Sequence, residues 1–171
     1  MHPMLRRSVL VLVVPLAGLV QTGCGSEIGD SCSISTDCSN SGDRICDTLS
    51  FEGYCTVFGC DSDTCPEESE CVRFFAGVST NLPCDPATED LPGAGGTDDC
   101  SLDELCSLSE NCVPRSAEIR YCMRLCDSHD DCRDGYECRD EELMRTHGGE
   151  PVPPAGETVL DNLRPFCGEA P

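Results

Sequence analysis

The chain has 171 residues, of which 17 are cysteine and none is tryptophan, and its net charge is −21. Cysteine at about one residue in ten is typical of a small exported protein held together by disulfides and argues against an ordinary cytosolic domain. The negative charge repels nucleic acid, so we expect no nucleic-acid partner.

The first 23 residues have the pattern of an export signal. A pair of arginines precedes the apolar stretch Val9 to Val20, whose twelve residues suit a signal-peptide core and are too few to span a bilayer. The stretch ends in Thr-Gly-Cys at Cys24, and this ending resembles that of bacterial lipoprotein signals. The resemblance implies that residues 1–23 are removed, that Cys24 becomes the new N-terminus and carries acyl chains such as palmitate, and that residues 24–31 form the anchor and tether.

An ordinary secretory signal is the alternative at this end of the chain, and it would leave Cys24 as a thiol or a disulfide partner. No A-x-A cleavage site precedes Cys24, and sixteen other cysteines already make an even set, so the sequence favours lipidation. Gly25, rather than aspartate, follows Cys24. By analogy with lipoprotein sorting, the resemblance implies an exported protein anchored by lipid in the outer membrane, facing the periplasm or the cell surface, with the membrane as its first partner.

The other sixteen cysteines divide into two groups of eight. Residues 85–99 separate them and are rich in Pro, Gly and Asp, which predicts a linker. The sequence therefore predicts a Cys-rich module over 32–84, a second over 100–167 and a short tail over 168–171. The cysteines expected to form disulfides in the first module are Cys32, Cys38, Cys46, Cys55, Cys60, Cys65, Cys71 and Cys84, and those in the second are Cys100, Cys106, Cys112, Cys122, Cys126, Cys132, Cys138 and Cys167.

The two modules also share local sequence. YCTVFGCDSDTCPEESEC from Tyr54 aligns with YCMRLCDSHDDCRDGYEC from Tyr121, which indicates an internal duplication. Because each set is even, we expect pairing within modules, while the individual bridges stay open among about 105 possibilities per module. The predicted fold is small and disulfide-rich, with two tandem eight-Cys modules of loops and turns, short strands and one or two short helices.

Three local elements are expected. Residues 72–78 favour a short strand. Ser101 to Glu104 has the form of a capping box, which predicts a short helix to about Leu108. Asp140 to His147 contains helix formers followed by two glycines, which predicts a second helix. The loops closed by the last cysteine of each module, 72–83 and 139–166, are apolar enough to be small cores or, alternatively, a partner-binding patch.

The sequence offers little for metal binding. It contains no C-x-x-C pair, which speaks against zinc and thiol redox chemistry. Asp130, Asp134, Gly135 and Glu141 match an EF-hand loop in part, but cysteines stand at two of its ligand positions. A looser Ca²⁺ site stays an alternative to solvated turn acids, and its candidate residues are Asp127, Asp130, Asp131 and Asp134, or Asp61 and Asp63.

Catalysis has no clear support in the sequence. A serine–histidine–aspartate arrangement would need His129 or His147, and His129 lies in a tight acidic loop where we expect it to be exposed and inert. We therefore expect no catalytic residue, no metal ligand and no cofactor.

The lipoprotein-type signal and acidic runs such as CDSDTCPEESEC resemble the Cys-rich, Lys-poor lipoproteins of myxobacteria. The resemblance implies a membrane-anchored envelope protein. Together with the lack of a catalytic motif, it leads us to expect a non-enzymatic role in binding or adhesion, with an unidentified protein as a possible partner. The alternatives are a structural envelope protein without a ligand, a secreted inhibitor or toxin-like disulfide module, and a Ca²⁺-dependent binding protein.

Overall fold

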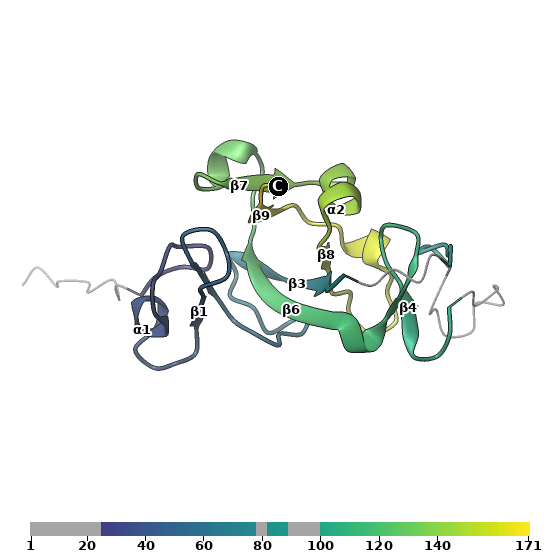
Figure 1. The fold of residues 1–171 in the computed structure, drawn as a ribbon, viewed down its shortest axis with the longest axis horizontal. Helices are drawn as coiled ribbons and strands as arrows, with labels where there is room; N and C mark the ends of the chain where they lie inside the picture. The colour runs from purple at the N-terminus through teal and green to yellow at the C-terminus, as the bar shows by residue number, and fades with distance from the viewer. Residues whose placement is uncertain (1–24, 78–81, 89–99) are drawn as a thin grey trace, which may run out of the picture.

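The computed structural model describes residues 25–77, 82–88 and 100–171 (Figure 1). The predicted signal over 1–23, the predicted lipidation site Cys24 and most of the predicted linker lie outside these residues. Short antiparallel strands and few helices make up the described part, and none of these helices is long and apolar enough to cross a membrane. The strands are β1 (Ile45–Asp47), β2 (Tyr54–Thr56), β3 (Ser69–Phe75), β4 (Glu104–Cys106), β5 (Cys112–Pro114), β6 (Glu118–Arg124), β7 (Tyr136–Arg139), β8 (Glu150–Pro151) and β9 (Phe166–Glu169), and the helices are α1 (Ser35–Cys38), α2 (Glu141–His147) and the 3₁₀ turns η1 (Arg115–Ala117), η2 (His129–Asp131) and η3 (Val159–Asn162).

Four small antiparallel sheets organise these elements. β1 pairs with β2, β4 with β5 and β7 with β9, while β3 lies between β6 and β8. The β3–β6 ladder is the longest and runs from Ser69 opposite Arg124 to Phe75 opposite Glu118. Figure 1 shows β3 and β6 in the middle of the molecule, α1 and β1 at one end, β4 at the other, and β7, β9 and α2 on one side.

Sixteen cysteines form eight disulfides, and two of these correct the expectation that all pairing stays within modules. Cys65 bonds Cys122 and Cys84 bonds Cys106, so each joins the first predicted group to the second. The physical reason for Cys65–Cys122 is strand pairing, because β3 of the first group and β6 of the second are neighbours in one sheet. Cys84 joins the second group because the segment 82–84 is hydrogen-bonded to residues 110–112, beside β5. The remaining bridges are Cys32–Cys46, Cys38–Cys55, Cys60–Cys71, Cys100–Cys112, Cys126–Cys138 and Cys132–Cys167.

The bridges repeat one arrangement in four units. In every unit the first cysteine bonds the third and the second bonds the fourth, and the third and fourth lie directly opposite each other on antiparallel strands. Unit 3 lies inside unit 2 in the sequence, between the third and fourth cysteines of unit 2. The units are unit 1 (Cys32, Cys38, Cys46, Cys55), unit 2 (Cys60, Cys65, Cys71, Cys122), unit 3 (Cys84, Cys100, Cys106, Cys112) and unit 4 (Cys126, Cys132, Cys138, Cys167).

An aspartate shapes the turn between the first two cysteines of units 1 and 4. One carboxylate oxygen of Asp37 accepts hydrogen bonds from the backbone N–H groups of Ser33 and Ile34. Asp131 accepts equivalent bonds from the backbone N–H groups of Asp127 and Ser128. These bonds hold the pKa of both carboxyls below the ordinary value, because they favour the ionised form. Part of the chain's acidity therefore serves local turn structure.

The loop from 139 to 166 supplies much of the central core, as one of the two interpretations of that loop predicted. Met144, Val152, Val159 and Phe166 are buried there and pack in one cluster with Val72 of β3 and residues of the other units. Small modules bury little apolar area, and the disulfides compensate by restricting the unfolded chain.

Two of the three local predictions agree with the structure. The helix predicted over 140–147 is α2. Asp140 is its N-cap and accepts a hydrogen bond from the backbone N–H of Leu143, and Gly148 follows its last residue at φ 81°. The strand predicted at Val72 is β3, which begins three residues earlier, at Ser69, and ends at Phe75. The helix predicted from Ser101 is wrong. Ser101 and Glu104 form only one turn, because the chain then enters β4 to place Cys106 opposite Cys112.

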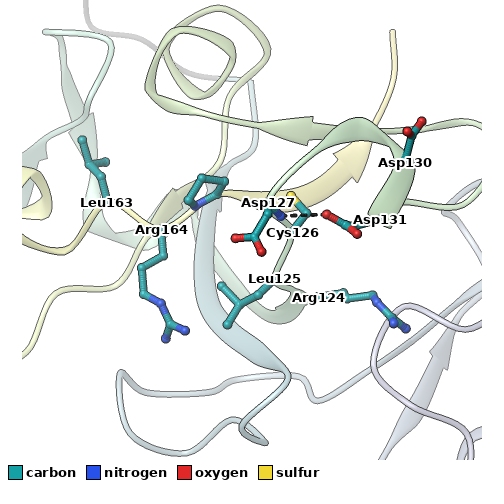
Figure 2. A pocket seen from close by; sticks show the side chains of 9 residues that line it. Arg124, Leu125, Cys126, Asp127, Asp130, Asp131, Leu163 and Arg164 are labelled. Atoms are coloured by element: carbon teal, nitrogen blue, oxygen red, sulfur yellow. Dashed lines mark hydrogen bonds between the residues drawn. The ribbon is translucent and has the colours of Figure 1, made fainter.

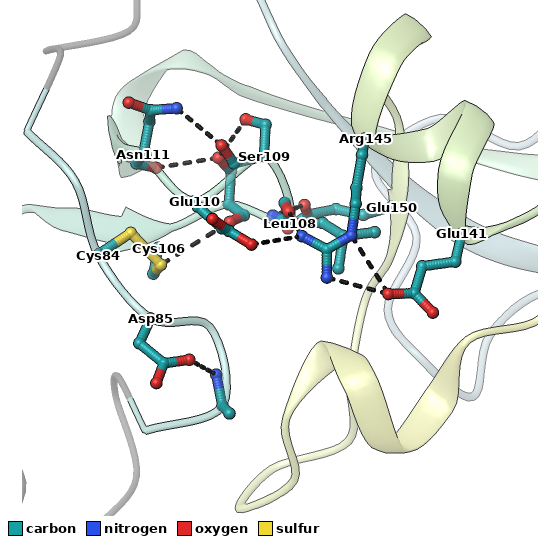
Figure 3. Close-up of polar contacts among 12 residues, drawn as sticks. Cys84, Asp85, Cys106, Leu108, Ser109, Glu110, Asn111, Glu141, Arg145 and Glu150 are labelled. Atoms are coloured by element: carbon teal, nitrogen blue, oxygen red, sulfur yellow. Dashed lines mark hydrogen bonds and ion pairs between the residues drawn. A yellow bond between two sulfur atoms is a disulfide. The ribbon is translucent and has the colours of Figure 1, made fainter.

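Unit 3 is attached to the core by α2 and β8 (Figure 3). Arg145 of α2 pairs with Glu110 at 3.1 Å and donates to the carbonyl of Leu108. Glu150 of β8 accepts a hydrogen bond from the backbone N–H of Leu108. On its other oxygen, Glu150 forms an ion pair with Arg73 of β3 at 2.6 Å, and both side chains are largely buried. This buried pair links unit 3 to the central sheet.

Candidate functional site

A cavity of about 310 Å³ lies among units 1, 2 and 4, and all three tyrosines of the chain line it. Its walls come from the β1–β2 hairpin, β3, β6, β7, α2 and β9. The apolar and aromatic wall consists of Tyr54, Thr56, Phe74, Tyr121, Met123 and Tyr136. The polar wall consists of Asp47, Ser50, Arg139, His147 and Glu169.

The strand register explains why these side chains converge. Tyr121 and Met123 alternate with Cys122 along β6, so they point to the face opposite its disulfide. Tyr54 likewise precedes Cys55 on β2. Each fourth cysteine of units 1 and 2 therefore faces its bridge, while the tyrosine before it faces the cavity.

The rings contact one another around the cavity. The centroids of Tyr54 and Tyr136 are 5.3 Å apart, and Phe74 meets Tyr121 edge-on at 6.3 Å. Phe74 also meets Phe166 at 6.3 Å, which connects the cavity wall to the core. Phe74 comes from the segment 72–83, for which a partner-binding patch was one of the two interpretations. This residue lies on a concave surface.

Backbone contacts fix the hydroxyl groups of two tyrosines. Tyr54 accepts a hydrogen bond from the backbone N–H of Arg124 at 2.9 Å. Tyr136 donates to the carbonyl of Phe51 at 3.0 Å. The guanidinium of Arg133 lies 4.3 Å from the centre of the Tyr136 ring, a cation–π distance. These contacts hold both rings in one orientation.

A buried charged group closes one side of the cavity. Arg139 donates to Glu137 at 3.1 Å, to the carbonyls of His147 and Gly148 at the end of α2, and to the carbonyl of Glu169. Glu137 also contacts Nδ1 of His147 at 2.6 Å. Burial lowers the pKa of Arg139, while the charges of Glu137 and Glu169 oppose this shift. Arg139 is therefore a structural cation whose charge is matched inside the protein.

Two carboxylates at the cavity have neutral partners instead. Asp47 accepts bonds from the backbone N–H of Leu49 and the hydroxyl of Ser50. Glu169 accepts a bond from the backbone N–H of Phe51 at 3.3 Å. Among the ion pairs of the described residues, neither carboxylate has an arginine or histidine partner. The charge of Glu169 nevertheless raises the pKa of Arg139, so it is partly matched, whereas no such interaction with Arg139 involves Asp47. The cavity therefore combines aromatic rings with negative charge that is only partly compensated.

We expect the tyrosines of the folded chain to titrate above the range of free tyrosine. Burial raises the pKa of Tyr54, Tyr121 and Tyr136 above the ordinary value of 10.0, and the charges of Asp47 and Glu169 raise those of Tyr121 and Tyr136 further. A raised folded-state pKa gives stability that is complete below the unfolded value and declines as pH rises, so the chain should lose stability above about pH 10.

The measurement is the ultraviolet absorbance of tyrosinate in the folded chain and in the chain unfolded by denaturant. Because the chain has three tyrosines and no tryptophan, the absorbance reports on this cavity alone. Tyr121→Phe serves as a control that removes one of the three transitions. Identical titration of the folded and unfolded chains would contradict the expected burial.

A second hollow of about 590 Å³ lies where the acidic turn of unit 4 meets residues 163–165 (Figure 2). Three of the predicted calcium ligands, Asp127, Asp130 and Asp131, line it, and the carboxylate of Asp131 is hydrogen-bonded to the turn backbone. Arg124 and Arg164 also line it, and each pairs with a glutamate elsewhere. Its charges are mixed and its acids exposed, which makes it a weaker candidate than the tyrosine cavity.

Groups of metal-ligating atoms in the described ranges consist of cysteines. Four such groups occur, one in each unit, and every member is bonded in a disulfide. Oxidised sulfur is a poor metal ligand, because metals bind the thiolate. The candidate acids Asp61, Asp63 and Asp134 belong to no cluster of three ligand atoms in this part of the chain.

The two histidines considered for catalysis lie apart. His129 is exposed on η2, as expected, and His147 contacts Glu137 at the end of α2. Among the side-chain contacts of the described residues, no serine hydroxyl reaches either imidazole, whereas a serine–histidine pair requires such contact.

No family model, curated protein or solved structure matches this chain. The case for the tyrosine cavity therefore rests on its own geometry. Sequence reasoning did not identify the cavity, although the repeated Tyr-Cys pairs at Tyr54 and Tyr121 were visible. Their position before the fourth cysteines of units 1 and 2 is the pattern that could have pointed to it.

Proposed function

We propose that this protein is a non-enzymatic, Cys-rich lipoprotein of the outer membrane, anchored through lipid on Cys24, whose folded part binds a partner at the tyrosine cavity. The observation that carries the binding role is the convergence of all three tyrosines on one cavity of about 310 Å³. The anchor rests on the lipoprotein-type ending of the export signal at Cys24.

The disulfide frame supports a binding role over a purely structural one. The three units that form the cavity are each fixed by two bridges, so its walls are already in place before a partner arrives. A preformed site loses less conformational entropy on binding and gains affinity accordingly. A structural envelope protein without a ligand would have no need to keep aromatic rings around an open space.

We also propose that the chain consists of two tandem eight-cysteine modules that arose by duplication. Cys60–Cys71 and Cys126–Cys138 are equivalent bridges in the two aligned segments from Tyr54 and Tyr121, and this equivalence supports a shared origin. Unit 3, set between the third and fourth cysteines of unit 2, would be the part that breaks the simple tandem order.

Mass spectrometry of the mature chain tests the anchor. We expect the N-terminal peptide to begin at Cys24 and to carry the mass of a diacylglycerol group with further acylation. Cys24→Ala should release the chain from the membrane fraction. A mature N-terminus at any other residue would overturn the lipoprotein assignment.

Cross-linking in intact cells tests the binding role. A specific partner should be captured by the wild-type chain and lost from the cavity variant Tyr121→Ser. Leu102→Ser is the matched control, since Leu102 is 94% exposed and is not among the residues that line the cavity. Equal capture by both variants would show that the cavity is not the binding site.

A further inference from the structure

We infer that the tyrosine cavity binds an organic cation, an ammonium or guanidinium group on a short apolar stem. This inference rests on the binding role proposed above and deepens it by naming the chemistry of the ligand. Such a group occurs in the lysine or arginine side chain of a protein partner and in free diamines.

Two cross-strand pairs set the charge of the site. Asp47 lies directly opposite Tyr54 in the β1–β2 ladder, and Glu169 lies directly opposite Tyr136 in the β7–β9 ladder. Residues opposite each other in an antiparallel pair share one face of the sheet. Units 1 and 4 therefore each bring one tyrosine and one carboxylate to the cavity together.

The cavity has negative charge that the protein matches only in part, through the interaction of Glu169 with Arg139. Asp47 and Glu169 accept hydrogen bonds only from neutral donors among the described residues. The one arginine of the wall, Arg139, has a carboxylate partner in Glu137 and donates to three backbone carbonyls. An anionic ligand would find these donors already used, whereas a cation would find two carboxylates available.

The aromatic rings add attraction for the same kind of ligand. A cation over an aromatic ring is attracted by about 0.5–2 kcal/mol, more when water is excluded. The guanidinium of Arg133 already lies over the ring of Tyr136, 4.3 Å from the ring centre. Tyr121 and Phe74 meet edge-on and have no cation partner within the described part of the chain. These two rings are left for the ligand.

The size of the cavity selects a single side chain or a small molecule. A volume of about 310 Å³ is at the lower end of ligand pockets and is too small for a helix or strand. The apolar contacts of Met123 and Thr56 suit the methylene stem of such a ligand. The combination matches an alkyl chain that ends in a cation.

Tyrosine fluorescence of the full mature chain, purified from membranes in detergent, measures binding directly, because every tyrosine lines the cavity. Three probes separate the sources: a capped tripeptide with central lysine, the same peptide with norleucine, and 1,5-diaminopentane. We expect a saturable change with lysine and none with norleucine. Stronger binding by the diamine than by the peptide would assign the site to free amines, and the reverse to a protein partner.

Charge variants test the role of the carboxylates. Asp47→Asn and Glu169→Gln keep an oxygen acceptor for the hairpin contacts, and each should weaken lysine binding about tenfold, as expected for the loss of one nearby charge. Glu67→Gln is the matched control, because Glu67 is exposed and lies outside the cavity. It should leave the affinity unchanged. Unchanged melting temperatures and eight intact bridges would show that the variants fold.

Three results would overturn the inference: equal binding of the lysine and norleucine peptides, equal weakening by Glu67→Gln, or no saturable change with either cationic probe. None of these depends on Cys24. If the N-terminus proved unlipidated while the lysine peptide still bound, the lipid anchor would be disproved and the cation site would be supported.

Discussion

Replacing Cys65 and Cys122 together by alanine is expected to lower the free energy of unfolding by about 4 kcal/mol. Their bridge closes 57 residues, the longest span of the eight, and the entropy that a bridge removes from the unfolded chain grows with the length of the loop. This bridge also joins the two predicted modules, so its loss frees β6 from the segment before β3. Urea unfolding without reductant measures the change.

The control is the double variant of Cys60 and Cys71, the other bridge of unit 2. It closes only 11 residues, and we expect a loss of about 3 kcal/mol. Because Cys71 and Cys122 lie opposite each other on β3 and β6, the two variants disturb the same place. A peptide map that joined Cys122 to any cysteine other than Cys65 would refute the four-unit arrangement.

Replacing Arg73 by methionine is expected to destabilise the chain by about 3–5 kcal/mol at neutral pH, because a buried carboxylate loses its cation. Glu150 is 3% exposed, and Arg73 is its ion-pair partner at 2.6 Å. Thermal and urea unfolding measure the effect. The second variant, Arg73→Met with Glu150→Gln, should recover most of the loss, since glutamine can still accept the hydrogen bond from Leu108.

The effect of Arg73→Met should depend on pH. Burial raises the pKa of Glu150 above 4.5 although Arg73 opposes the shift, so removing Arg73 raises it further. With a folded-state pKa above the unfolded value, the contribution of this group is complete at low pH and declines as pH rises. The deficit of the variant should therefore shrink between about pH 7 and pH 5. A deficit that is constant over this interval would show that packing, rather than charge, accounts for it.

The sequence was enough to predict a small disulfide-rich fold, because cysteine density and the shortage of large apolar residues allow few other solutions. It was also enough to predict α2, because its N-cap residue Asp140 and the glycine after its last residue, Gly148, are both recognisable in the sequence. It was not enough for the bridges. Cys65–Cys122 depends on β3 pairing with β6, and no local pattern reports a contact between strands that are far apart in sequence.

The candidate site was harder to predict than the fold. Its tyrosines come from three units, and a cavity among units depends on how the units pack. Asp47 and Glu169 are two of 32 acidic residues, and composition alone gives no reason to choose them. Their cross-strand position opposite Tyr54 and Tyr136 distinguishes them, and that position follows from the register of two short ladders.

The placement of unit 3 within unit 2 affects how the chain can be oxidised during synthesis. In a chain that emerges from its N-terminus, Cys65 appears long before Cys122, and Cys71, Cys84, Cys100, Cys106 and Cys112 all appear in between. Bridges formed strictly in order of appearance would consume Cys65 with an incorrect neighbour. Because every unit bonds its first cysteine to the third and its second to the fourth, the native set needs either delayed closure or thiol–disulfide exchange, and the Cys65–Cys122 bridge has the longest wait. We therefore expect a catalyst of disulfide isomerisation to speed the oxidative folding of this chain.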